Sequence, residues 1–231
     1  MTVIELCVED TEGVQIASQM GIDRVELCDD LSCGGLTPSD RVVDSALSVA
    51  PSGGMQVLIR PRPGTFVMPS GEERDIAEAM RRLRERTDHT DIPVGFVVGG
   101  LTSDHEIDQD VLLLWRDAAG ERPLTFHRAF DTVQNMDRSL DQLICAGFDR
   151  VLTTGGDASV VNVENIRHLT DRAAGEMIIL VSGGLRSHNV ASVIHSTGAT
   201  EVHMRAPAQQ PGRTDPDEAQ RIVAVVRGQN L

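Results

Sequence analysis

The chain has no lysine and no tyrosine, and all 21 of its basic residues are arginine. Without a lysine amine, the protein cannot form the Schiff base of an aldolase or attach pyridoxal phosphate covalently. Acidic residues outnumber basic residues by 35 to 21, which gives a formal net charge of -14. Nucleic acids and anionic membranes attract proteins with an excess of positive charge, so we expect neither as a partner.

Long apolar runs are also missing. No segment approaches the roughly 18 consecutive apolar residues of a membrane-spanning helix. The first residues, MTVIELCVED, contain a carboxylate at Glu5 and no basic segment ahead of an apolar run, which argues against a secretory signal peptide. We therefore expect a cytoplasmic protein. No linker or low-complexity segment divides the chain, so we expect residues 1–231 to form a single domain.

Cysteine is scarce, and the four residues are Cys7, Cys28, Cys33 and Cys145. In a cytoplasmic chain this number favours free thiols over a disulfide framework. Cys145 lies in a segment with helical periodicity, NMDRSLDQLICA, and we expect it to belong to the hydrophobic core.

Strand-like and helix-like segments alternate along the whole chain. Eight runs rich in β-branched, aromatic and aliphatic residues predict strands: TVIELC, RVELC, QVLIR, VGFVV, LTFHR, RVLTT, MIILVS and TEVHM. Helical periodicity predicts helices between them, for example over 11–20, 37–50, 71–87, 135–146 and 157–173. Eight such units are typical of a closed (β/α)₈ barrel or of an open doubly wound sheet.

Polar residues within the strands distinguish these two folds. An open parallel sheet is covered by helices on both faces, and its strands are continuous apolar runs. Here charged or titratable residues interrupt or end five strands, at Glu5, Glu26, Arg60, His127 and His203. Only a barrel offers an inner face that opens to a polar mouth, so we predict an α/β fold of the (β/α)₈, TIM-barrel type.

The runs VIELC and RVELC place Glu, Leu and Cys in the same order on two predicted strands. Successive side chains of a strand point to opposite faces. We therefore expect Glu5, Cys7, Glu26 and Cys28 to point into the upper barrel. The residues expected to face the helices instead are Leu6, Leu27 and Phe126.

Arginines and glycines gather at the ends of later strands. The segment RPRPGTF alternates Arg60 and Arg62 with prolines, which stiffens the backbone and suits recognition of a carboxylate or phosphate. The segment SGGLRSHNV, and before it TTGGDAS, places a glycine pair between strand and helix, where backbone amides bind phosphate in many barrels. The alternatives are a structural ion pair for Arg60 and tight turns for the glycines. The predicted anion site comprises Arg60, Arg62, Arg128, Gly183, Gly184, His203 and Arg205.

Four residues are candidates for proton transfer. The segment TFHRAFD places His127 and Asp131 at the end of one strand, and a histidine pKa near 6.5 suits acid–base chemistry at neutral pH. Glu5 and Glu26 are the other candidates. For His127 the alternative is a buried, hydrogen-bonded structural histidine, and this alternative carries more weight for His203, which no neighbouring motif supports.

The chain resembles the CutC family of copper homeostasis proteins, in order and over nearly its whole length. The motifs that carry the resemblance are ELCVED, GIDRVELCDDLSCGGLTPS, LIRPRPGTF, GFVVGGLT, HEIDQDVL, TFHRAFD, GFDRVLTTGG, ILVSGGL and EVHMRA. The resemblance implies a cytosolic (β/α)₈-type barrel, often a homodimer, that binds copper(I) through cysteines.

Carried onto this sequence, the copper ligands would be Cys7 and Cys28, with Cys33 nearby as a further candidate. Soft thiolates select copper(I); the alternative is that both are small, reduced core thiols. The chain departs from the family pattern in HMRAPAQQPGRTDPDEAQ, which puts in doubt any ligand contact from the loop after the last strand.

Two functions therefore stay open from the sequence. One is a copper(I)-binding homeostasis protein that uses the two cysteines. The other is an enzyme acting on a phosphorylated or carboxylated small molecule, with the predicted anion site holding the substrate and the acid–base candidates moving protons.

Overall fold

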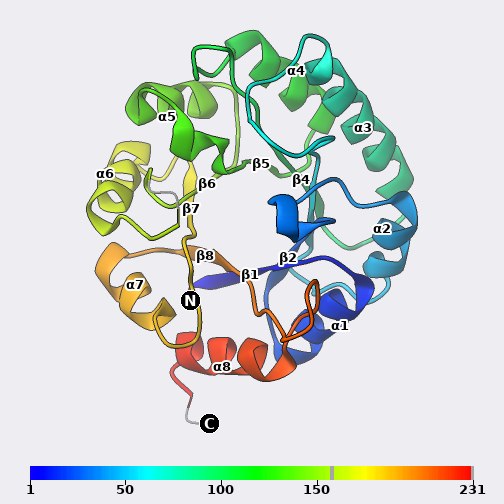
Figure 1. Ribbon diagram of the computed structural model, residues 1–231, viewed down its shortest axis with the longest axis vertical. Helices are drawn as coiled ribbons and strands as arrows, with labels where there is room; N and C mark the ends of the chain where they lie inside the picture. Colours follow the sequence, from blue (N-terminus) through cyan, green and yellow to red (C-terminus); the bar gives the residue numbers. More distant parts are fainter. Residues whose placement is uncertain (157–158, 230–231) are drawn as a thin grey trace.

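The computed structural model describes residues 1–156 and 159–229. Eight parallel strands close into one barrel in chain order, and Figure 1 shows the helices as a ring outside them. The predicted (β/α)₈ barrel is confirmed. The strands are β1 (Val3–Val8), β2 (Arg24–Leu27), β3 (Met55–Leu58), β4 (Val94–Val98), β5 (Leu124–Phe126), β6 (Arg150–Thr153), β7 (Ile178–Val181) and β8 (Glu201–Met204). The helices are α1 (Thr11–Met20), α2 (Asp40–Leu47), α3 (Glu72–Thr87), α4 (Gln109–Ala119), α5 (Met136–Cys145), α6 (Val163–Ala173), α7 (Val190–Thr197) and α8 (Pro216–Arg227), with short 3₁₀ helices η1 (Leu31–Cys33) and η2 (Arg128–Thr132).

The main hydrophobic core lies between the barrel and the ring of helices. Leu6, Leu27 and Phe126 are fully buried members of this core, together with Trp115 of α4. Burying a side chain of this size stabilises the fold by about 1.5–3 kcal/mol. The prediction that the three strand residues face the helices is confirmed, and alternation then directs Glu5 and its equivalents into the barrel.

Glycines end several helices and begin the short turns into the next strand. Gly21, Gly147 and Gly198 have φ of 80°, 76° and 73°. This left-handed conformation is common after the last helical residue, and it costs glycine little because glycine has no Cβ. In the part of the chain that the structure describes, none of the helices is both long and apolar enough to cross a membrane.

The helix expected over 157–173 begins later, at Val163. Asn162 caps it, because its side-chain oxygen accepts a hydrogen bond from the Asn165 N–H at 3.1 Å. The Asn162 N–H in turn donates to Thr154 O at 2.8 Å, which ties the helix start to the end of β6. Residues 157–158 of the expected helix lie outside the described residues.

The expectation that Cys145 is a core residue is wrong. Cys145 is the last residue of α5 and is exposed. The buried face of α5 is formed by Ser139, Leu140 and Leu143. Two residues along a helix correspond to a rotation of roughly 200°, so Cys145 lies almost opposite Leu143 and faces solvent.

Candidate functional site

The lower part of the barrel interior, near the amino ends of the strands, holds a buried network of charges. Arg24 Nε donates to Glu5 Oε2 at 2.5 Å, and Arg24 Nη2 donates to Glu201 Oε2 at 2.6 Å. Arg150 Nε donates to the same Glu201 oxygen at 2.8 Å. Two carboxylates and two guanidinium groups thus compensate one another, as buried charges require.

Sequence reasoning missed Arg24, Arg150 and Glu201 because it considered the carboxyl ends of the strands, where barrel enzymes carry their chemistry. These residues could have been found from the alternation of side chains along a strand, which had already placed Glu26 on the inner face. Arg24 precedes Glu26 by two residues and Glu201 precedes His203 by two, so each pair shares the inner face of its strand.

Above this network, toward the carboxyl ends of the strands, two thiols meet a carboxylate and an imidazole. Cys7 Sγ lies 3.6 Å from Cys28 Sγ and donates to Glu26 Oε1 at 3.6 Å. His203 Nδ1 lies 2.8 Å from Glu5 Oε1. One ligand atom each from Cys7, Glu26 and His203 lies within 4.8 Å of the others. The structure therefore brings together five residues that the sequence singled out, from β1, β8 and the end of β2.

The charges of this cluster shift one another's pKa values. Burial alone would raise the pKa of Glu5, but Arg24 and His203 lower it to about 2. Burial raises the pKa of Glu26, which His203 offsets only in part. Burial would lower the pKa of His203, yet Glu26, Cys7 and Glu5 together raise it well above its ordinary value. The hydrogen bond with Cys28 and burial raise the pKa of the Cys7 thiol well above its ordinary value.

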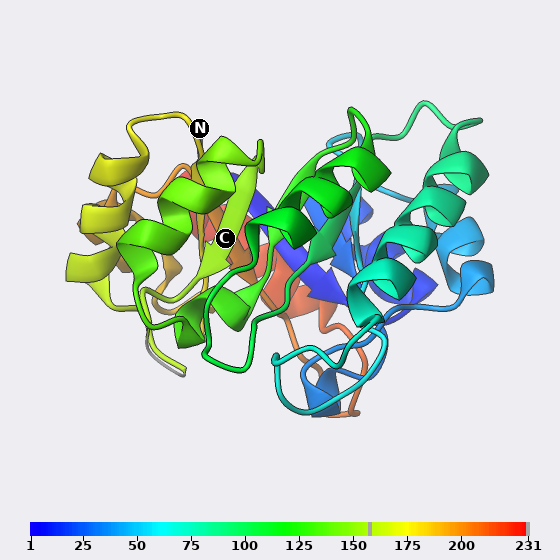
Figure 2. The ribbon, with the colours of Figure 1, turned by 90° about the horizontal axis from the view of Figure 1, so that it is seen from above.

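A cavity of about 160 Å³ opens above the cluster. Its apolar walls are Leu31, Leu58, Phe66 and Leu152. Its polar walls include Cys7, Glu26, His127, His203 and Arg205. Figure 2 shows η1, which contributes Leu31, and the loop after β8 projecting from the same end of the barrel. The cavity therefore lies at the end where (β/α)₈ enzymes bind their ligands.

His127 is fixed in one orientation at the end of β5. Its Nδ1 accepts a hydrogen bond from the Ala129 N–H at 3.1 Å, and its ring lies 4.9 Å from the Phe66 ring. Gly99 makes room for the ring, because a Cβ at this position would come within 2.3 Å of His127 Nδ1. Burial and the neighbouring Arg60 lower the pKa of His127 to about 3. The imidazole is therefore neutral at physiological pH.

The two arginines of RPRPGTF are largely occupied by hydrogen bonds within the chain. Arg60 donates to the carbonyl oxygens of Cys33, Gly35 and Gly64 at 3.3, 2.8 and 2.9 Å. It lines the cavity, but it pairs with neither Glu5 nor Glu26, which the sequence had left as an alternative.

Arg62 turns toward α3 rather than toward the cavity. Its Nε and Nη2 donate to the Glu72 carboxylate at 2.6 and 3.2 Å, and Nη2 also donates to Val67 O at 2.7 Å. The two arginines of the predicted anion site therefore support loops instead of converging on one point.

Both glycine-rich turns have a carboxylate from this chain against their backbone amides. Asp131 accepts hydrogen bonds from the Thr154 and Gly156 N–H groups at 3.0 and 3.2 Å. After β7, where Gly183 and Gly184 have φ of 119° and 65°, the carboxylate of Glu218 accepts from the Ser187 N–H and hydroxyl, both at 2.9 Å.

These carboxylates explain what the two turns do. In the turn after β6, the Asp131 carboxylate occupies amides of the kind that hold phosphate in other barrels, and it also pairs with Arg128 Nε at 2.8 Å. In the turn after β7, Glu218 contacts Ser187 rather than the glycine pair. Sequence reasoning missed Glu218, since it lies on α8, 31 residues beyond Ser187.

The remaining predicted residues lie around the mouth. Arg128 and Arg205 line the cavity, and Arg205 makes a 3.8 Å ion pair with Glu9. Cys33 ends η1, and its thiol donates to Asp30 O at 3.1 Å. Cys33 is thus outside the Cys7 and Cys28 pair, although its carbonyl group helps to hold Arg60.

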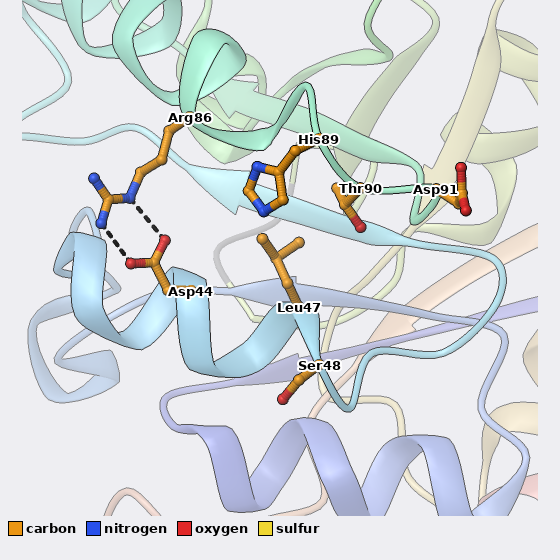
Figure 3. A pocket seen from close by; sticks show the side chains of 7 residues that line it. All are labelled: Asp44, Leu47, Ser48, Arg86, His89, Thr90 and Asp91. Atoms are coloured by element: carbon orange, nitrogen blue, oxygen red, sulfur yellow. Dashed lines mark hydrogen bonds and ion pairs between the residues drawn. The ribbon is translucent and has the colours of Figure 1, made fainter.

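A larger hollow of about 630 Å³ lies on the outer surface between α2 and the segment after α3. Figure 3 shows that an ion pair of Arg86 with Asp44 crosses one side of it, with His89 and Asp91 on the other. It is far more open than the barrel cavity, and neither a buried unpaired polar atom nor a metal-binding group of the described residues lies in it. We therefore take the smaller cavity as the candidate functional site.

Fold and site together define a (β/α)₈ barrel protein with a buried thiol pair next to a cavity at the carboxyl ends of its strands. The sequence model of the CutC family matches residues 2–208. The chain belongs to the CutC family. A protein from Homo sapiens named copper homeostasis protein cutC homolog is 35% identical over 207 residues, which are 88% of this chain and 72% of that protein. A CutC family protein of Pasteurella multocida is 37% identical over 202 residues, 87% of this chain and 80% of that protein.

Solved structures agree with this assignment. A crystal structure of a copper homeostasis protein CutC from Streptococcus agalactiae superposes with a TM-score of 0.79 at 32% identity, covering 88% of this chain and 98% of that chain. Phosphoribosyl anthranilate isomerase from Thermotoga maritima superposes with a TM-score of 0.65 at 16% identity, covering 99% and 100%. The second likeness shows the shared barrel fold alone.

Proposed function

We propose that this CutC family protein binds copper(I) with the thiolates of Cys7 and Cys28 and with the imidazole of His203 as a third donor. The observation that carries the proposal is the 3.6 Å separation of the two sulfur atoms, of which Cys7 Sγ belongs to a residue in the wall of the cavity. The proposal includes the cytosolic location and the homodimer that the family resemblance implies. Light scattering coupled to size-exclusion chromatography tests the dimer.

The donor set fits copper(I). Thiolate and imidazole are ligands that copper accepts, and thiolate is the ligand that selects copper(I) over hard cations. With metal–sulfur bonds of about 2.3 Å, the length known for zinc thiolates, two sulfur atoms on one ion lie at most about 4.6 Å apart. The shorter separation of 3.6 Å would let one ion contact both sulfurs. His203 would be the third donor, because one of its ring nitrogens lies within 4.8 Å of Cys7 Sγ.

Glu26 has a separate role in this proposal. The Cys7 thiol donates to Glu26 Oε1, so the carboxylate is placed to accept the proton that the thiol loses when metal binds. The Glu5 carboxylate orients the His203 ring through Nδ1. Because neighbouring acidic groups raise the pKa of His203, the ring would release its Nε2 proton to solvent on metal binding, as would the Cys28 thiol.

Copper(I) affinity should be measured under reducing conditions against a competing chelator. Replacing both Cys7 and Cys28 with Ser should lower the affinity by at least about a hundredfold, since it removes both soft ligands. Cys33→Ser and Cys145→Ser are the matched controls, and both should leave the affinity unchanged. Unchanged affinity in the Cys7→Ser, Cys28→Ser double variant would overturn the proposal.

The hydrogen bonds around the rim support copper binding over the anion-acting enzyme. Arg62 donates to Glu72, the Thr154 amide of the turn after β6 donates to Asp131, and the Ser187 amide after β7 donates to Glu218. No observation favours a substrate phosphate at the predicted anion site, so we do not propose the enzyme as a second function.

A further inference from the structure

Two polar atoms in the cavity walls have no hydrogen-bond partner. Among the described residues, five buried side-chain atoms lack one, and those that line the cavity are Glu26 Oε2 and His127 Nε2. Both residues are only 5% exposed. A buried polar group without a partner destabilises the fold, so a ligand that forms the missing hydrogen bond gains affinity.

His127 offers a hydrogen-bond donor of fixed position. Because Nδ1 accepts from the Ala129 N–H, the single ring proton of the neutral imidazole is on Nε2. The low pKa of His127 supports this neutral form. Phe66 and the close approach of Gly99 hold the ring, so the N–H direction is set before any ligand arrives. The matching ligand group is an oxygen acceptor.

Glu26 faces the same cavity from the end of another strand. Its Oε1 accepts from the Cys7 thiol, which leaves Oε2 for a ligand. A hydroxyl group can both donate and accept, so it complements Oε2 whether the carboxyl group is ionised or protonated. β2 and β5 are separated by β3 and β4 in the barrel, so the two unpaired atoms lie on different sides of the cavity.

The remaining walls limit the size and charge of the ligand. The volume of about 160 Å³ corresponds to a handful of water molecules at about 30 Å³ each, which suits a short metabolite. Leu58, Phe66 and Leu152 provide apolar contacts for a hydrocarbon segment. Arg128 and Arg205 also line the cavity and favour a negative charge on the ligand.

We propose that this cavity binds a short-chain hydroxy acid, with a carboxylate oxygen accepting from His127 Nε2–H and the hydroxyl group meeting Glu26 Oε2. This site shares Arg128 and Arg205 with the predicted anion site but uses neither Arg62 nor the glycine turns. It does not depend on copper binding, which the Cys7 and Cys28 variants test independently.

The test uses the full chain, metal-free and reduced, with 3-hydroxybutyrate as the probe. Butyrate lacks the hydroxyl group and 1,3-butanediol lacks the carboxylate, so the three compounds separate the two contacts. The histidine side-chain ¹H–¹⁵N signals report on His127 directly. We expect 3-hydroxybutyrate to shift the His127 Nε2 signal saturably and to bind about tenfold or more tightly than either analogue.

His127→Phe keeps a ring and removes the donor, and His127→Asn keeps an acceptor for the Ala129 N–H as a second variant if the first fails to fold. Binding to folded variants, followed by calorimetry, should weaken about tenfold or more. His168→Phe on the exposed face of α6 is the matched control and should bind like the wild type. The proposal is overturned if none of the three compounds shifts the His127 signal, or if a folded His127 variant binds 3-hydroxybutyrate as tightly as the wild type.

Discussion

The two Glu-Leu-Cys copies lie on neighbouring strands and face the same barrel interior, yet their carboxylates differ. Glu5 is bonded through one oxygen to Arg24 and through the other to His203. Glu26 accepts from the Cys7 thiol through one oxygen and has no partner for the other. The pKa of Glu5 is lowered to about 2, whereas that of Glu26 is raised.

The difference shows that the partners of a group, rather than its motif, decide what it can do. A fully paired carboxylate stabilises a network and has no capacity left for a ligand. A carboxylate with an unpaired oxygen costs stability and retains that capacity. His127 belongs with Glu26 in this respect, because its Nε2 is also unpaired.

The largest expected effect concerns His127 in acid. Its pKa is lowered from 6.5 to about 3. Between these two pH values the histidine binds a proton in the unfolded chain but not in the folded chain. The stability that depends on this neutral imidazole is complete above pH 6.5 and is lost as the pH falls toward 3, by on the order of 5 kcal/mol. Urea unfolding across this range should show the loss in the wild type and a shallower dependence in His127→Phe.

The exposed His168 again provides the control for this measurement. His168→Phe should keep the wild-type dependence of unfolding free energy on pH, since its side chain is 52% exposed. If the free energy of unfolding depends on pH in the same way in the wild type and in His127→Phe, His127 is not held neutral by burial.

The same substitution, Glu to Gln, at each of the two carboxylates tests the comparison directly. Glu5→Gln leaves Arg24 with Glu201 as its remaining carboxylate partner and removes the carboxylate partner of His203, so it should destabilise the fold by about 3–5 kcal/mol. Glu26→Gln removes a charge that lacks a full set of partners and should change the free energy of unfolding by less than about 1 kcal/mol. Chemical denaturation of both variants measures this, and equal losses would mean that the pairing difference has no energetic consequence.

A smaller loss of stability than that of Glu5→Gln is expected at the rim. Arg62→Ala removes hydrogen bonds to Glu72 and Val67 O that are partly exposed, so it should cost about 1–2 kcal/mol in unfolding free energy. Copper(I) affinity should stay the same, because Arg62 does not line the cavity. A weaker copper affinity in a folded Arg62→Ala protein would show that the rim and the cavity act as one site.

Much of the candidate site could be predicted because strand alternation is local. The positions of Glu5, Cys7, Glu26 and Cys28 on the inner face follow from the two-residue period of a strand, and the same rule could have found Arg24. The assignment of Cys145 to the core was wrong because an α-helix has 3.6 residues per turn. A shift of one or two positions along the helix therefore moves a side chain from the core to the solvent.

The sequence alone determined the eight strand–helix units, the inner and outer faces of the strands, and the gathering of thiols, carboxylates and histidines at one end of the barrel. Only the tertiary structure decided which of these groups have a hydrogen-bond or ion-pair partner. Glu5 and His203 are 198 residues apart, and Ser187 meets Glu218 on α8. Such partners are set by barrel closure, strand register and side-chain packing, which bring distant segments into contact, whereas the face of a side chain depends on its own backbone.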